Sequence, residues 1–169
     1  MRRKLYRSVG ESVLMTQMVE SGPAATAIRF LRSLENGDLA AVKTLIAPEF
    51  TMQFPGGVEF ADFDALFAWA RGRYTGVRKK FERIDAAESN GTAIVHVSGT
   101  LSGRWLDGDE FSGIRYIDRF DLKAGLIVRQ TVWNDMGEAK LKRQTGHGAA
   151  INPADKTSSA SGTSGASGV

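Results

Sequence analysis

The chain has 169 residues, 42% of them hydrophobic and 24% charged, which is typical of one globular domain with tails. Its net charge of +3 is small and is not gathered on one predicted face, so we expect no nucleic-acid partner. The absence of cysteine excludes disulfides and thiolate chemistry and fits a cytoplasmic location.

Both ends of the chain are predicted to lie outside the folded domain. Residues 1–20 begin with basic residues but lack the apolar stretch of a signal peptide, and we interpret them as a flexible extension. Residues 157–169 are rich in Ser, Gly and Ala and cannot bury enough apolar surface to fold. We therefore place the domain at residues 21–138 and a disordered tail at 139–169. No transmembrane segment is visible, so we expect no membrane partner.

The first third of the domain mixes helices with one strand. Apolar residues recur at helical spacing over residues 23–34, with proline in the first turn. Asp38 is placed to cap a second, shorter helix over residues 39–47. Residues 49–54 then alternate between apolar and polar side chains, which predicts a half-buried strand.

A third helix and a long sheet follow. Asp62 is placed to cap a helix over residues 62–74, and residues 77–135 read as antiparallel strands. Three glycine-containing turns divide those strands, and each fixes a register. They are Asn90-Gly91, Asp107-Gly108 and Lys123-Ala124-Gly125.

The three registers agree on which side chains share a face. The first turn opposes Ile84 to Val97, the second opposes Val97 to Asp118, and the third opposes Asp118 to Gln130. The resulting apolar face, which we expect to be concave and covered by helices, contains Ile84, Val95, Val97, Gly99, Leu101, Ile114, Tyr116, Asp118, Phe120, Val128, Gln130 and Val132. Asp118 is the one carboxylate among these groups.

This order of elements resembles the nuclear transport factor 2-like (NTF2-like) superfamily, specifically its SnoaL-like branch. The resemblance covers residues 23–135 and is most specific in GDLAAVKTLIAPEF, YIDRFDLKAGLIV and the closing VWND. It implies an α+β fold in which a cone-shaped, curved antiparallel sheet of about four to six strands is covered by three N-terminal helices around a pocket. Members include ketosteroid isomerases, polyketide cyclases, dehydratases, epoxide hydrolases and proteins that only bind or assemble.

Carried over position by position, the resemblance excludes standard ketosteroid isomerase chemistry. The isomerase tyrosine of the first helix falls on Phe30 and its general base falls on Phe54, while only the later acidic residue is kept, as Asp118. Phenylalanine cannot remove a proton. Polyketide cyclases of this branch rely on a single acidic residue, and Asp118 would suffice for that role.

Asp118 is the candidate catalytic residue. Burial among apolar side chains should raise its pKa, as a general acid near neutral pH requires. The alternative is a structural carboxylate satisfied by Gln130, Tyr116 or a helix-side arginine such as Arg73. Both interpretations stay open at this point.

The pocket implied by the resemblance would be lined mainly by aromatic and aliphatic side chains, which could equally be plain core. The candidate ligand-binding residues are Tyr116, Gln130, Phe30, Met52, Phe54, Trp69, Val97, Phe120 and Val132. Tyr116 lies opposite Gly99, which would leave space beside its ring. His96 falls on the convex face between Asp85 and Arg119, and with no ligand cluster we expect neither a metal nor another cofactor.

The convex face carries an unusual apolar strip. It contains Ile117, Ile127, Thr131 and Trp133 and is edged by Arg115, Arg119 and Arg129. Because such a strip is rarely left in water, we expect a homodimer through this face, in which Arg115, Ile117, Thr131 and Trp133 take part.

Two hypotheses for the function follow. In the first, the protein binds a small apolar or aromatic molecule and acts as an isomerase, cyclase or dehydratase through proton transfer by Asp118. In the second, it is a non-catalytic NTF2-like ligand-binding or dimerisation module. An ion-paired Asp118 in a filled interior would favour the second, and a titrating Asp118 in an open cavity the first.

Overall fold

The computed structural model describes residues 22–145, so the predicted extension at 1–20 and most of the predicted tail lie outside the described residues. The chain divides into two units, one ending at Met136 and one beginning at Gly137. Helix α5 (Met136–Gln144) falls almost entirely in the second unit. Sequence analysis did not predict this helix, and the predicted tail begins inside it, so the boundary at 138 stays a prediction.

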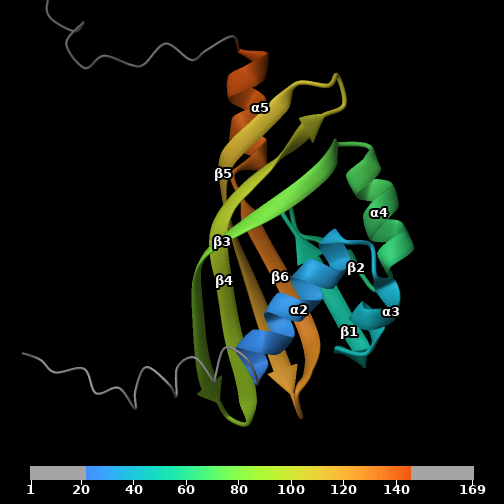
Figure 1. Cartoon of the computed structure of the whole chain (residues 1–169), viewed down its shortest axis with the longest axis vertical. Coiled ribbons are helices and arrows are strands. Elements are labelled where there is room, and N and C mark those ends of the chain that lie inside the picture. Colours follow the sequence, from blue (N-terminus) through green and yellow to red (C-terminus); the bar gives the residue numbers. More distant parts are fainter. Residues whose placement is uncertain (1–21, 146–169) are drawn as a thin grey trace, which may run out of the picture. The chain divides into compact units, whose positions relative to one another are not determined.

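Over its described residues, 22–136, the first unit contains three helices and one six-stranded sheet, as the α+β prediction required. The helices are α2 (Pro23–Glu35), α3 (Leu39–Lys43) and α4 (Phe63–Arg71). The strands are β1 (Ile46–Phe54), β2 (Val58–Phe60), β3 (Tyr74–Ser89), β4 (Thr92–Trp105), β5 (Glu110–Lys123) and β6 (Leu126–Asn134). They pair in the order β2-β1-β6-β5-β4-β3, antiparallel except for β1 beside β6, in a curved and unclosed sheet (Figure 1).

The helices begin where their capping residues predict. The carboxylate of Asp38 accepts a hydrogen bond from the backbone N–H of Ala41 at 2.9 Å, and that of Asp62 accepts one from Ala65 at 2.8 Å. The helix predicted over 39–47 is shorter, because the chain enters β1 at Ile46. No helix within residues 22–145 has the length and apolarity needed to cross a membrane.

Two of the three predicted registers are confirmed and one is wrong. Ile84 faces Val97 and Val97 faces Asp118, as predicted. The turn after β5 has two central residues instead of three, since Ala124 and Gly125 both have positive φ, 47° and 81°, as in a type I′ turn.

A bulge in the pairing of β5 with β6 shifts the third register further. Asp118 therefore faces Val132, and Gln130 faces Phe120 while staying on the inner face. Ile127, predicted for the convex strip, is fully buried opposite Leu122 instead. A single extra residue on one strand reverses which side chains point inward beyond it.

The core lies between the inner face of the sheet and the helices. Phe30 of α2 packs with its ring centroid 5.6 Å from those of Phe50 and Phe120, and Phe63 of α4 stacks on Phe50 at 6.0 Å. Each fully buried phenylalanine stabilises the fold by about 2 kcal/mol through removal of its apolar surface from water. This cluster holds α2 against the sheet (Figure 1).

Candidate functional site

Asp118 lies in the middle of β5 on the inner face, as predicted, and its side chain is 0% exposed. Val97 of β4 and Val132 of β6 flank it across the sheet. A carboxylate in such apolar surroundings needs a compensating charge or a proton.

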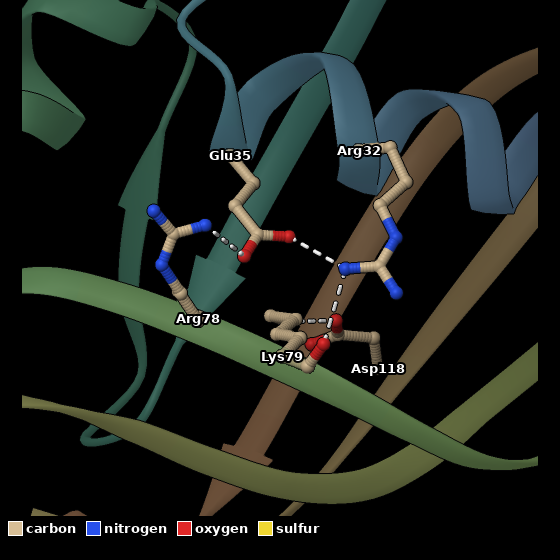
Figure 2. A network of polar contacts seen from close by, with 5 residues as sticks. All are labelled: Arg32, Glu35, Arg78, Lys79 and Asp118. Carbon is tan, nitrogen blue, oxygen red and sulfur yellow. Dashed lines mark hydrogen bonds and ion pairs between the residues drawn. The ribbon is translucent and has the colours of Figure 1, made fainter.

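The compensating charge comes from Lys79 of β3, a residue that sequence analysis did not single out. The ammonium group of Lys79 donates a hydrogen bond to Oδ2 of Asp118, and the lysine side chain is only 19% exposed. The same ammonium lies 4.4 Å from the centre of the Tyr116 ring, a cation-π contact that orients it further. Figure 2 shows the Lys79 and Asp118 side chains in contact, although β4 lies between their strands in the sheet.

Lys79 points inward because β3 is bulged. The pairing of β3 with β4 shifts between Phe81 and Arg83. Lys79 and Phe81 therefore share the inner face with Ile84, although strict alternation along a strand would place odd-numbered and even-numbered residues on opposite faces. Gly99 permits this close approach, since a Cβ atom there would overlap the backbone carbonyl oxygen of Lys80. The space predicted beside Tyr116 is therefore occupied by the β3 backbone. The sequence held one signal for this bulge. Phe81 and Ile84 are both apolar but lie three residues apart, and a regular strand cannot bury two side chains at that spacing on one face.

The end of α2 holds the β3 backbone next to this ion pair. Arg32 donates to Glu35 at 2.7 Å and to the carbonyl oxygen of Lys79 at 3.1 Å, and its guanidinium lies 4.0 Å from the centre of the Phe81 ring. Arg78 lies 3.8 Å from Glu35 on the other side (Figure 2). Arg32 is thus the helix-side arginine near the site, and it binds the backbone of Lys79 and not the carboxylate of Asp118.

Arg73, the arginine suggested as a partner for Asp118, is engaged elsewhere. Its guanidinium lies 4.1 Å from the centre of the Trp69 ring. That part of the structural interpretation is wrong, because the partner is a lysine on an edge strand.

Burial dominates the titration behaviour of the site. Removal from water raises the pKa of Asp118, while the charge of Lys79 and polar interactions with Lys79 and Gln130 act in the opposite direction without cancelling it. Burial, followed by the negative charge of Asp118, also raises the pKa of Tyr116. The phenol therefore stays protonated and able to donate a hydrogen bond.

Three buried polar atoms near the ion pair lack a hydrogen-bond partner within the described part of the chain. They are the Tyr116 hydroxyl, Oδ1 of Asp118 and Oε1 of Gln130. Tyr116 and Asp118 are two residues apart on one strand face, and Gln130 lies diagonally across from Asp118. Buried polar atoms are nearly always satisfied, so such a group indicates a place where water or a ligand supplies the missing bonds.

Of the other candidate ligand-binding residues, Val97 and Val132 flank Asp118, and the rest separate into two groups. Phe30, Met52 and Phe120 are 0% exposed and belong to the filled core. Phe54 and Trp69 are half-buried and pack with the buried Phe60 against that same core.

The part of the chain that the structure describes contains no group of three or more His, Cys, Asp or Glu side chains able to hold a metal ion. His96 lies between Asp85 and Arg119 across the sheet, as predicted.

Comparison with known proteins places this geometry in context. The model of a family described as SnoaL-like domain matches residues 27–130. A search of curated proteins found no match. Among solved structures, TerC co-crystallised with polyporic acid superposes with a TM-score of 0.59 at 14% identity, over 72% of this chain and 97% of TerC.

Two further structures show the same fold. An NTF2-like protein of unknown function from Burkholderia pseudomallei has a TM-score of 0.57 at 17% identity, over 73% of this chain and 96% of its own. IdmH from Streptomyces antibioticus, proposed to be a polyketide cyclase, has a TM-score of 0.54 at 15% identity, over 73% of this chain and 98% of IdmH. At such identities the likeness establishes the fold and leaves the chemistry to the residues.

Proposed function

The chain belongs to the family of SnoaL-like domains, and on that premise we propose that it binds a small, mostly apolar molecule whose polar end meets Asp118, Tyr116 and Gln130. The observation that carries this proposal is the group of unpartnered buried atoms beside the Lys79–Asp118 ion pair. Most buried polar atoms are satisfied, and the three that are not within the described residues lie together on one face of two adjacent strands.

The unpartnered atoms determine which polar groups the bound molecule must carry at the end that meets them. Oδ1 of the Asp118 carboxylate and Oε1 of Gln130 accept hydrogen bonds, so the bound molecule must donate, most simply through hydroxyl groups. The Tyr116 hydroxyl can donate to a carbonyl oxygen in return. Relatives crystallised with polyporic acid or proposed to be polyketide cyclases support a small-molecule ligand.

Proton transfer by Asp118 is the second candidate function, in the isomerase, cyclase or dehydratase class. The raised pKa of Asp118 favours it, because the carboxyl can then hold and release a proton, with Lys79 stabilising the carboxylate that remains. The ion pair and the filled aromatic core favour binding alone. We therefore rank binding first.

Calorimetric titration with hydroxylated polycyclic aromatic compounds tests binding. We expect Asp118→Asn and Lys79→Met to weaken binding at least tenfold, which corresponds to one lost charge-assisted hydrogen bond of about 1.4 kcal/mol. Lys80→Met, which removes a neighbouring exposed lysine, is the matched control and should bind like the wild type. Equal binding by all four proteins would refute the proposal.

Deuterium incorporation separates catalysis from binding. If Asp118 transfers protons, a bound compound with an acidic C–H should exchange with heavy water in the wild type and not in Asp118→Asn, as followed by NMR. Binding without exchange leaves the non-catalytic function.

We also propose a homodimer through the outer face of the sheet. Ile117 and Trp133 face one another there and are 37% and 50% exposed, with Thr131 and the Asp135-paired Arg115 beside them. Trp133→Lys should then yield a monomer in sedimentation equilibrium, whereas Leu106→Lys, at another exposed apolar position, should not. A wild-type monomer at micromolar concentration would contradict this.

A further inference from the structure

A hollow of about 340 Å³ lies between β3, β4 and β5, and its lining includes none of Lys79, Asp118, Tyr116 or Gln130. It forms where the pairing on both sides of β4 is interrupted, between Thr75 and Arg78 on β3 and beside Ser102 on β4. Gly76 and Gly113 lie in these interruptions with φ of 59° and 71°, values that glycine adopts without strain. Bulges of this kind occur preferentially next to binding sites, because they re-aim side chains.

The side chains around the hollow combine two guanidinium groups with three hydroxyls. Arg78 and Arg104 come from neighbouring strands, and the hydroxyls belong to Thr75, Ser102 and Ser112. Within residues 22–145 none of these hydroxyls has a side-chain hydrogen bond to another residue. All three can therefore donate to a bound group.

The charges of the lining favour an anion. Arg104 is held in place by Glu110 and by the carbonyl oxygen of Gly108, at 2.5 and 3.4 Å. Arg78 is 77% exposed, and its ion pair with Glu35 is long at 3.8 Å, so its guanidinium is only weakly engaged. Two positive lining residues against one negative leave the hollow with an excess of positive charge.

We propose that this hollow is a second ligand site, which binds the phosphate group of a small phosphorylated molecule. Guanidinium groups match phosphate oxygens in pairs, and hydroxyl donors complete the coordination. The volume exceeds that of a phosphate and lies at the small end of ligand pockets. The Phe111 ring lines the hollow beside these polar groups, which favours a molecule with a ring attached to the phosphate.

NMR titration of the full-length protein with phenyl phosphate tests the proposal. We expect saturable shifts of the backbone amides of Gly76, Ser102 and Ser112 with a dissociation constant of about 1 mM. The amides of Asp118 and Gln130 should not move, which separates this site from the one proposed above. Inorganic phosphate should bind the same amides several-fold more weakly, and phenol should not bind them.

Charge variants test whether phenyl phosphate binds through the arginines of the hollow or through the general positive charge of the surface. The double variant Arg78→Gln with Arg104→Gln should lose binding at least tenfold, since both phosphate-binding guanidiniums are gone. Arg83→Gln, an exposed arginine of the same strand outside the hollow, should bind as the wild type does. Glu110→Gln should tighten binding a few-fold by removing the negative charge.

Three outcomes overturn the proposal. The first is an absence of saturation at about 20 mM phenyl phosphate, far above the expected constant. The second is equal weakening by Arg83→Gln, which would indicate general electrostatics. The third is unchanged binding by the double variant.

Discussion

The two faces of the sheet hold ion pairs of the same chemistry in opposite surroundings. On the inner face Lys79 pairs with Asp118, and the side chains are 19% and 0% exposed. On the outside Lys80, the next residue, lies 3.2 Å from Glu82, with 77% and 46% of these side chains exposed. One position along β3 thus separates a pair removed from water from a pair surrounded by it.

The difference shows that the inner pair is a costly feature. Exposed pairs contribute little, because water screens them and the side chains lose freedom. A buried pair must offset the loss of hydration of two charges, and apolar residues of the same volume would often serve stability as well. Stability alone therefore does not explain the inner pair, whereas the binding function proposed above would explain it.

Removing one partner of each pair gives the largest contrast between the faces. Lys79→Met leaves the buried carboxylate of Asp118 uncompensated and should lower the free energy of unfolding at pH 7 by about 3–5 kcal/mol. Lys80→Met should change it by no more than about 0.5 kcal/mol. Urea denaturation followed by circular dichroism measures both.

The double variant Lys79→Met with Asp118→Leu serves as the control for this experiment. It removes both charges, so it should recover most of the stability lost in Lys79→Met. A double variant as unstable as the single one would mean that Lys79 acts through packing and not through its charge.

The bulge after Phe81, which turns Lys79 inward and Lys80 outward, can also be tested directly. Gly99→Ala places a methyl group against the carbonyl oxygen of Lys80, so we expect a loss of about 1–3 kcal/mol or a shift of the β3 register. Gly72→Ala is the matched control, because its Cβ would meet only the carbonyl oxygen of Trp69 at an ordinary 3.7 Å. Thermal unfolding measures both changes, and a tolerated Gly99→Ala would show that the bulge is not held by this contact.

The strand pairing could be predicted from the sequence wherever a turn could be recognised correctly. Asn90-Gly91 and Asp107-Gly108 fixed the pairing of the first three long strands, and they placed Asp118 in the interior opposite Val97. The third turn failed because Ala124 adopts a positive φ, which is uncommon for alanine and is permitted here by the hairpin around it.

The partner of Asp118 could not be predicted in the same way. Alternation counted back from Ile84 puts Lys80 and Glu82 inside, and only the bulge after Phe81 reverses this and selects Lys79. The strand β2 was missed because three residues are too few to show a pattern. A β-bulge inserts one extra residue into a strand, and its position is set by tertiary contacts such as that between Gly99 and Lys80. The sequence pattern of a single strand does not determine that position.

The pH dependence of unfolding gives the smallest and most specific test of the inner face. The pKa of Asp118 is raised by burial, so the folded state holds the proton more tightly than the unfolded state does. This contribution is fully present below the unfolded pKa of about 3.9 and is lost as the pH rises through the folded pKa. The charge of Lys79 acts against this contribution, because it favours the ionised carboxylate.

Comparison with Asp118→Asn isolates this contribution. Between pH 4 and about pH 8, the free energy of unfolding of the wild type should fall relative to that of Asp118→Asn, since asparagine does not titrate. The exposed Glu82→Gln variant should run parallel to the wild type over the same range. A wild-type curve that instead rises against Asp118→Asn would mean that the attraction of Lys79 outweighs burial, and Asp118 would then be an ordinary ionised partner with no proton to transfer.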